Sequence, residues 1–109
     1  MAVRRLNVPL ILEADERAAD GMGGHRVTWR ALGILHAALD AGAGRMLGGE
    51  AGRQGVAPWR ITLRAFAPGD PRRPAPGQRL RMGARIFRIH AVAEADPAGR
   101  YLSVTAMED

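Results

Sequence analysis

The sequence predicts an all-β fold, a small antiparallel β-barrel of about six strands with a long glycine-rich loop. Apolar residues recur at every second position over several stretches, which is the pattern of half-buried antiparallel strands. Glycine and proline gather between these stretches, where turns are needed. The chain has 109 residues, a length that suits one modest core. We therefore expect residues 1–109 to form a single domain.

Alternation of apolar and polar residues marks five of the expected strands. One face of each strand would pack on the core while the other faces solvent. The residues expected to point inward are Leu10 and Leu12 in 10–14, Val27, Trp29 and Ala31 in 25–32, Ile61, Leu63 and Ala65 in 60–66, Phe87, Ile89, Ala91 and Ala93 in 85–94, and Leu102, Val104 and Ala106 in 101–107. Val92 lies on the other face of its stretch, so that face is expected to be partly covered.

Residues 32–41 fit two structures. A helical stripe would consist of Leu32, Leu35, His36 and Leu39. A strand face would consist of Leu35, Ala37, Leu39 and Ala41. The alanine content favours a helix, but the stretch is short and includes Gly33, so we predict a sixth strand.

Glycine and proline define the connections. Residues 20–24 (Asp-Gly-Met-Gly-Gly) predict a hairpin loop, because glycine tolerates positive φ. Residues 96–99 (Asp-Pro-Ala-Gly) place proline and glycine as a type I turn prefers. The four prolines of 68–77 predict an extended, rigid crossing of the surface. Residues 42–58 are rich in glycine without periodicity, and we expect a loop that is flexible or becomes ordered on assembly.

The chain is basic, with a net charge of +5, and all 16 of its basic residues are arginine. Together with abundant alanine and glycine, this is typical of a GC-rich genome, although the charge also favours contact with DNA or an acidic protein surface. Stacking aromatics and a basic helix, which mark dedicated nucleic-acid binders, are missing from the pattern. The chain has no cysteine, as is common inside cells, and we expect neither a signal peptide nor a membrane span.

We expect no enzymatic activity and no catalytic, cofactor or metal site. The only serine, Ser103, lies within a strand and lacks the turn of a nucleophile elbow. The glycine-rich turn at 20–24 lacks the context of a phosphate-binding loop. The three histidines are far apart in sequence and have no carboxylate at ligand spacing: His25, His36 and His90. The nearby acids are expected to be solvated, with Glu13 pointing outward from its strand: Glu13, Asp15 and Glu16.

A series of short motifs follows the chain from the first turn to the last strand. In order they are Asp20-Gly-Met-Gly-Gly, Val27-Thr-Trp, Ile61-Thr-Leu-Arg, Pro76-Gly-Gln-Arg, Gly83-Ala-Arg-Ile-Phe-Arg-Ile and Gly99-Arg-Tyr-Leu-Ser-Val. This order resembles that of the phage head-tail joining proteins, and the C-terminal half is most similar to the versions in gene transfer agents. His36-Ala37 departs from the Trp-Ala that the family often has at this place, which leaves the packing of that strand open.

The resemblance implies a structural connector of the stopper type, at the head-tail interface of a phage or gene transfer agent particle assembled in the bacterial cytoplasm. It implies a homo-oligomeric ring, expected to be a hexamer, with portal, adaptor and tail-terminator proteins as neighbours and without a cofactor or membrane. By position, the loop with Arg45 and Arg53 would point into the channel and contact packaged double-stranded DNA by charge, without reading sequence.

Two alternatives remain open. A stand-alone OB-like β-barrel that binds nucleic acid would have a similar strand pattern, and tight binding of single-stranded DNA would distinguish it. A tail-terminator protein from the neighbouring position in the particle is the second alternative. Terminators more often carry a clear helix over the sheet, which this sequence does not predict.

Overall fold

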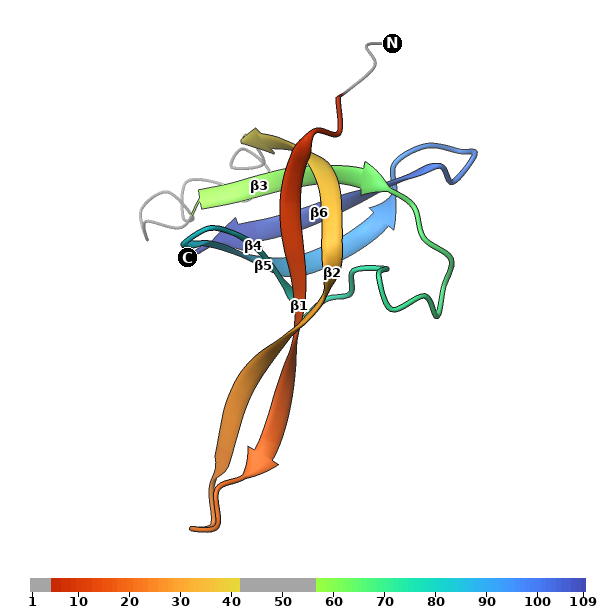
Figure 1. Cartoon of the computed structure of the whole chain (residues 1–109). Coiled ribbons are helices and arrows are strands. Elements are labelled where there is room, and N and C mark those ends of the chain that lie inside the picture. Colours follow the sequence, from red (N-terminus) through yellow and green to blue (C-terminus); the bar gives the residue numbers. More distant parts are fainter. Residues whose placement is uncertain (1–4, 42–56) are drawn as a thin grey trace.

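The structure is an antiparallel sheet that closes on itself as a barrel (Figure 1). The computed structural model describes residues 5–41 and 57–109. Within these residues the strands are β1 (Val8–Ala19), β2 (His25–Ala41), β3 (Ala57–Arg64), β4 (Arg79–Met82), β5 (Arg85–Glu94) and β6 (Tyr101–Glu108). They are neighbours in the order β1-β2-β3-β6-β5-β4, and β4 pairs with β1 to complete the circle. The described residues contain no helix, so the predicted all-β barrel is confirmed.

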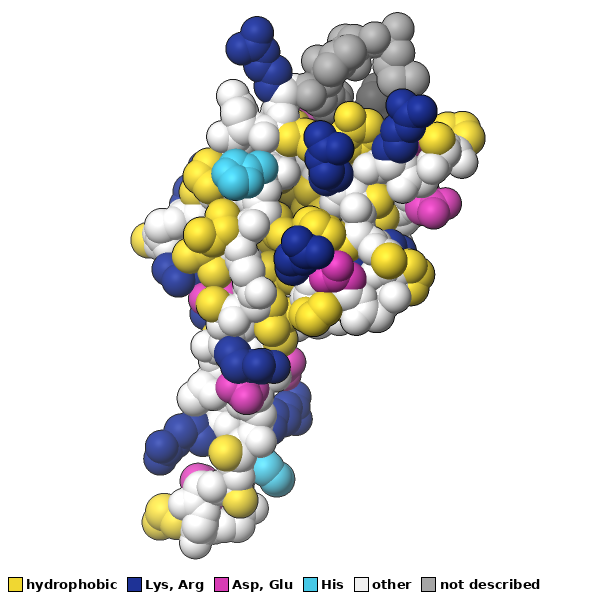
Figure 2. Space-filling view, turned by 45° about the vertical axis from the view of Figure 1, so that its right-hand side comes forward, with side chains coloured by type: hydrophobic (Ala, Val, Ile, Leu, Met, Phe, Trp, Pro, Cys, Tyr) yellow, Lys and Arg dark blue, Asp and Glu magenta, His cyan; other side chains and the backbone are white. Residues whose placement is uncertain are grey.

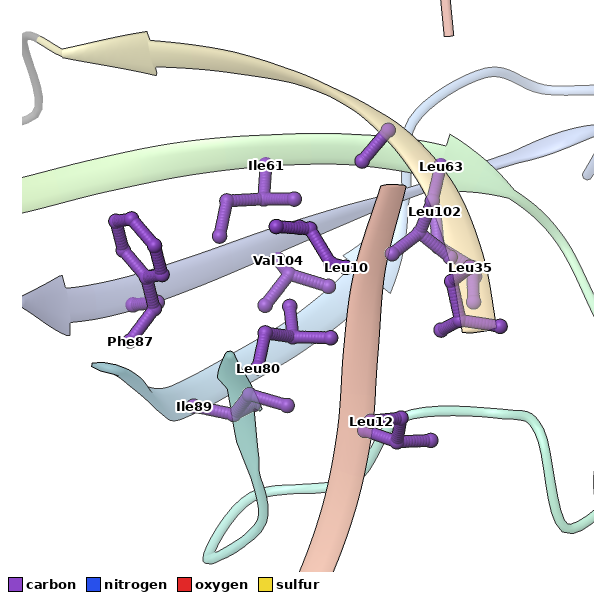
Figure 3. Packing of buried hydrophobic residues seen from close by; sticks show 12 residues of the cluster. Leu10, Leu12, Leu35, Ile61, Leu63, Leu80, Phe87, Ile89, Leu102 and Val104 are labelled. Atoms are coloured by element: carbon purple, nitrogen blue, oxygen red, sulfur yellow. The ribbon is translucent and has the colours of Figure 1, made fainter. Parts of the chain in front are cut away.

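An apolar cluster fills the barrel, and every strand contributes to it (Figure 3). Its side chains come mainly from alternate positions, because neighbouring residues of a strand point to opposite faces. The buried members are Leu10, Leu12, Leu35, Ala37, Ile61, Leu63, Leu80, Phe87, Ile89, Leu102, Val104 and Ala106. Burying each larger side chain stabilises the fold by roughly 1.5–3 kcal/mol. The facing predicted for 10–14, 60–64 and 101–107 is therefore confirmed.

The first two strands form a hairpin that is much longer than the barrel (Figure 1). β1 pairs with β4 only at residues 11–13, and β2 pairs with β3 only at residues 37–41. The remaining length of the hairpin extends away from the barrel as a twisted, two-stranded ribbon. We call residues 14–31 the arm.

The strands that the sequence predicts over 25–32 and 32–41 are one continuous strand, β2. Its ladder with β1 runs past Gly33 and is interrupted only by a shift between Leu12 and Glu13. The prediction of a strand rather than a helix in this region is confirmed. Conversely, the alternation did not indicate β4, which is only four residues long.

A β-bulge in β5 overturns the facing predicted for its second half. Ile89 pairs with Ala106 while Ala91 pairs with the adjoining Thr105, so an extra residue lies between them. As a result Ala91 and Ala93, predicted to point inward, are exposed. Val92 instead packs against the core, because the inserted residue shifts the alternation by one.

The inward facing predicted for 25–32 is also wrong for most of its residues. Val27 is 48% exposed and Ala31 is exposed too. Both lie on the arm, which has left the barrel and has no core to cover. Trp29 is half-buried, through contacts with the outer side of the barrel that are described below.

Both predicted turns are confirmed. In the first, the Asp20 carboxylate accepts hydrogen bonds from the backbone N–H groups of Met22 and Gly24, at 2.8 and 3.1 Å. In the second, the Gly99 N–H donates to the backbone oxygen of Asp96 at 3.0 Å. The Asp20 carboxylate thus fixes the first turn, as this residue type commonly does.

The connection from β3 to β4 differs from the extended crossing predicted for 68–77. It runs as a series of turns, and the Arg73 guanidinium donates to the backbone oxygen of Phe66 at 2.7 Å. Pro74 is buried, so the segment is attached to the barrel rather than only crossing its surface. Of the predicted loop 42–58, residues 42–56 lie outside the described residues, and residues 57 and 58 already belong to β3, where they pair with β6.

Candidate assembly surfaces

The arm carries charges of both signs along its length (Figure 2). An Arg17 nitrogen lies 3.8 Å from an Asp15 oxygen, and an Arg30 nitrogen lies 3.7 Å from a Glu16 oxygen. Both pairs are well exposed, so each contributes less than about 1 kcal/mol. The two acids are solvated as predicted, and the arm is a polar ribbon in water.

Both edges of the arm have open hydrogen-bonding groups. Within the described residues, β1 pairs only with β2 over residues 14–19, and β2 pairs only with β1 over residues 25–36. A two-stranded ribbon is only marginally stable by itself, and an open strand edge is a template for further contacts. These properties suit a surface that neighbouring protein molecules cover.

Glu13 is a buried carboxylate at the base of the arm. It lies on the outer face of β1, as predicted, but is only 5% exposed, so the expected solvation is wrong. Two arginines from β4 cover it: Arg79 Nε donates to Oε1 at 2.7 Å and Arg81 Nε donates to Oε2 at 3.0 Å. Burial would raise the pKa of Glu13, but these charged hydrogen bonds outweigh it and hold the pKa below its ordinary 4.5.

Arg79 also connects the barrel to Trp29 on the arm. Its guanidinium carbon lies 4.1 Å from the centre of the indole ring, within the range of a cation–π contact. One side chain of β4 therefore contacts both Glu13 and Trp29, at the place where β1 and β2 leave the barrel. This contact fixes the direction of the arm relative to the barrel.

A second charged cluster lies where β3 and β5 begin and β6 ends. The Trp59 indole N–H donates to Glu108 Oε1 at 2.9 Å, and Arg85 donates to both oxygens of the same carboxylate at 2.7 and 3.0 Å. The hydrogen bond from Arg85 is the main reason why the pKa of Glu108 lies below its ordinary 4.5. Trp59 also packs edge-on against Phe87, with 5.8 Å between the ring centroids. The cluster fixes the start of β3.

A groove of about 450 Å³ opens where β2 separates from β3. The two strands pair at Ala37 and Leu63 but no further toward the arm, which leaves a gap in the barrel wall. Apolar side chains of its lining are Leu6, Ile34, Phe66 and Tyr101, and polar ones are His36 and Arg64. Ile34 is 63% exposed, which is unusual for an isoleucine.

The residues that sequence analysis singled out do not come together in one site. Arg45 and Arg53, the predicted channel residues, lie outside the described residues. The three histidines are exposed on different parts of the molecule. In the part of the chain that is described, no group of acids and histidines could hold a metal ion. The described residues likewise include no helix suited to crossing a membrane.

Sequence reasoning missed the arm, the groove and the charged cover of Glu13. Residues 15–20, Asp-Glu-Arg-Ala-Ala-Asp, gave one signal, because they follow an apolar strand without continuing its alternation. When a strand continues after its apolar alternation has stopped, the added residues lie beyond the core. The groove left no comparable signal, since it depends on where two distant strands separate.

The chain was compared with known proteins and structures. Curated proteins give no significant match. A chain of a solved structure described as "Virion of native gene transfer agent (GTA) particle" is 49% identical, with a TM-score of 0.79 over 98% of both chains. The family described as phage head completion protein matches residues 1–109, which agrees with the resemblance to joining proteins of phages and gene transfer agents. The chain therefore belongs to the phage head completion proteins, a family of structural components of the virion.

Proposed function

We propose that this chain is the subunit of a stopper-type ring that completes the DNA-filled head and joins it to the tail. The observation that carries the proposal is its 49% identity, over 98% of both chains, with a chain of a gene transfer agent virion. At this identity over this length, the two chains are expected to share surfaces as well as fold. The ring would have six copies, with the portal and its adaptor on one side and the tail terminator on the other.

The shape of the molecule supports a role in assembly. A rigid barrel carries an arm whose edges are open in the described residues, and such edges call for neighbours. Contacts between unlike surfaces of identical subunits close into a ring when the rotation is right. A ring would therefore satisfy the groups that a single copy leaves in water.

The channel of the proposed ring would be lined in part by residues 42–56, which precede β3. This segment contains Arg45 and Arg53, and the whole chain has a net charge of +5. Arginines at a channel wall would attract the phosphates of packaged DNA without selecting a sequence. The proposed ring would in this way help to retain the DNA.

Deletion of the gene in a strain that makes the particles tests the proposal. We expect heads without attached tails, and restoration of joined particles by a copy with a tag at its N-terminus. Electron microscopy of the tagged particles should then place the chain between the portal adaptor and the tail. Normal tailed particles after deletion would contradict the proposal, and a tag located at the tail end of the joint would indicate a terminator.

A further inference from the structure

Two exposed apolar features lie on separate parts of this molecule. Met22 is at the tip of the arm and is 90% exposed, and Figure 2 shows hydrophobic side chains at that end. The second feature is the groove between β2 and β3, with Ile34 on its rim. Methionine is flexible and fills irregular apolar pockets well. The tip thus has a suitable side chain, and the groove has room for one.

The tip of the arm cannot reach the groove of its own molecule. β2 is an uninterrupted strand from His25 to Ala41, and Ile34 is nine residues along it from His25. At the usual rise of a strand these nine residues span about 30 Å. Only a second copy could place its tip in this groove.

The charges beside the two features are complementary. Asp20 closes the turn at the tip, two residues before Met22. Arg64 belongs to the lining of the groove and is exposed. Neither residue forms an ion pair with another described residue. The tip therefore offers an apolar side chain beside a carboxylate, and the groove offers an apolar lining beside a guanidinium, each without an ion-pair partner in the described part of the chain.

We infer that the arm of each subunit docks into the groove of the next copy, an inference that rests on the proposed ring. Met22 occupies the apolar lining beside Ile34, and the Asp20 carboxylate faces the Arg64 guanidinium. The contact joins two different surfaces of identical chains, the type of contact that closes a ring when the rotation between copies is right. It also covers the exposed isoleucine and gives the arm a partner.

Disulfide trapping tests the contact in assembled particles. The chain has no cysteine, so a Met22→Cys, Ile34→Cys double variant carries only the introduced pair. After oxidation with diamide, we expect a ladder of covalent oligomers that ends at the size of the ring. The matched control is Met22→Cys with Ala84→Cys, which uses an exposed alanine in the β4–β5 turn. We expect at least about tenfold less cross-linking in the control, since a docked pair has a high effective concentration.

A pair of substitutions at the tip supplies an independent measurement. Met22→Asp should reduce the yield of joined particles at least about tenfold, because a carboxylate is poorly tolerated in an apolar groove. Met22→Leu should preserve the yield. Met22 is almost fully exposed in the single chain, so neither variant should change its unfolding temperature, and loss of folding would not account for a lower yield.

The outcomes separate this inference from the proposed function. If the tagged chain is present between head and tail but the two cysteine pairs cross-link equally, the docking is wrong and the ring stands. Equal particle yields for Met22→Asp and Met22→Leu would lead to the same conclusion. If the chain is absent from the particles, the proposed function fails and the docking fails with it.

Discussion

Glu13 shows how a single carboxylate can hold an extended element in place. It is covered by Arg79 and Arg81, and Arg79 in turn contacts Trp29 on the arm. Both guanidinium groups come from β4 and keep part of their surface in water, so the cost of burying the charges is smaller than for a fully enclosed ion pair. The geometry favours a net stabilising interaction.

Replacing Glu13 by glutamine tests this interaction. The amide carries no charge and turns an NH2 donor toward one of the two arginines, so we expect the free energy of unfolding to fall by about 1–3 kcal/mol. Urea denaturation followed by circular dichroism measures the change. Glu16→Gln is the matched control on the exposed arm, and its effect should stay within about 0.5 kcal/mol. Equal effects of the two substitutions would contradict the assigned role.

The charged clusters also predict how stability depends on pH. The pKa values of Glu13 and Glu108 are lowered in the folded chain from 4.5. Their contribution is therefore present above about pH 4.5 and is lost as the pH falls through the lowered folded values. The unfolding temperature should drop as the pH falls below about 4.5, and less steeply in a Glu13→Gln, Glu108→Gln variant. Parallel profiles for the variant and the unchanged chain would refute this account.

Among the strands, those with a regular alternation on the core could be predicted, whereas the four-residue β4 and the exposed facing of the arm could not. Leu102, Val104 and Ala106 alternate because every second residue of β6 faces the cluster. Alternation in the sequence reflects which residues are buried. It therefore predicted neither the length of the exposed arm nor the bulge after Ile89. The charged cover of Glu13 depends on pairing across 66 residues of sequence, which a local pattern does not contain.

Shortening the arm tests whether the barrel folds independently of it. Replacing residues 16–28 by Asn-Gly would join the paired residues Asp15 and Trp29 through a two-residue hairpin turn. The core members lie outside the deleted segment, so we expect the unfolding temperature to change by less than about 5 °C. Thermal unfolding measures this, and joined particles should be lost in the same variant. Collapse of the β-sheet signal would show that the arm is part of the folding unit.

For the whole molecule, the balance of charge predicts the kind of nucleic-acid binding. The net charge is +5, and the described residues contain no helix that could enter a DNA groove. We therefore expect weak, sequence-independent binding to double-stranded DNA that decreases with salt. Fluorescence anisotropy with two unrelated duplexes and a single strand measures it. Exchanging Arg45 and Arg53 for alanine should reduce the salt slope by up to about 1.8. Tight, preferential binding of the single strand would favour the OB-like alternative.

β1 and β2 continue from the barrel into the arm with one register shift, between Leu12 and Glu13, and this continuity has a mechanical consequence. A neighbouring copy that pulls on the docked tip would load twelve residues of β1 along the strand direction. The bonds between antiparallel strands lie across that direction, so those joining β1 to β4 and β2 to β3 would share the force in shear. We expect the connection to resist tension along the strands and to bend first at the register shift between Leu12 and Glu13.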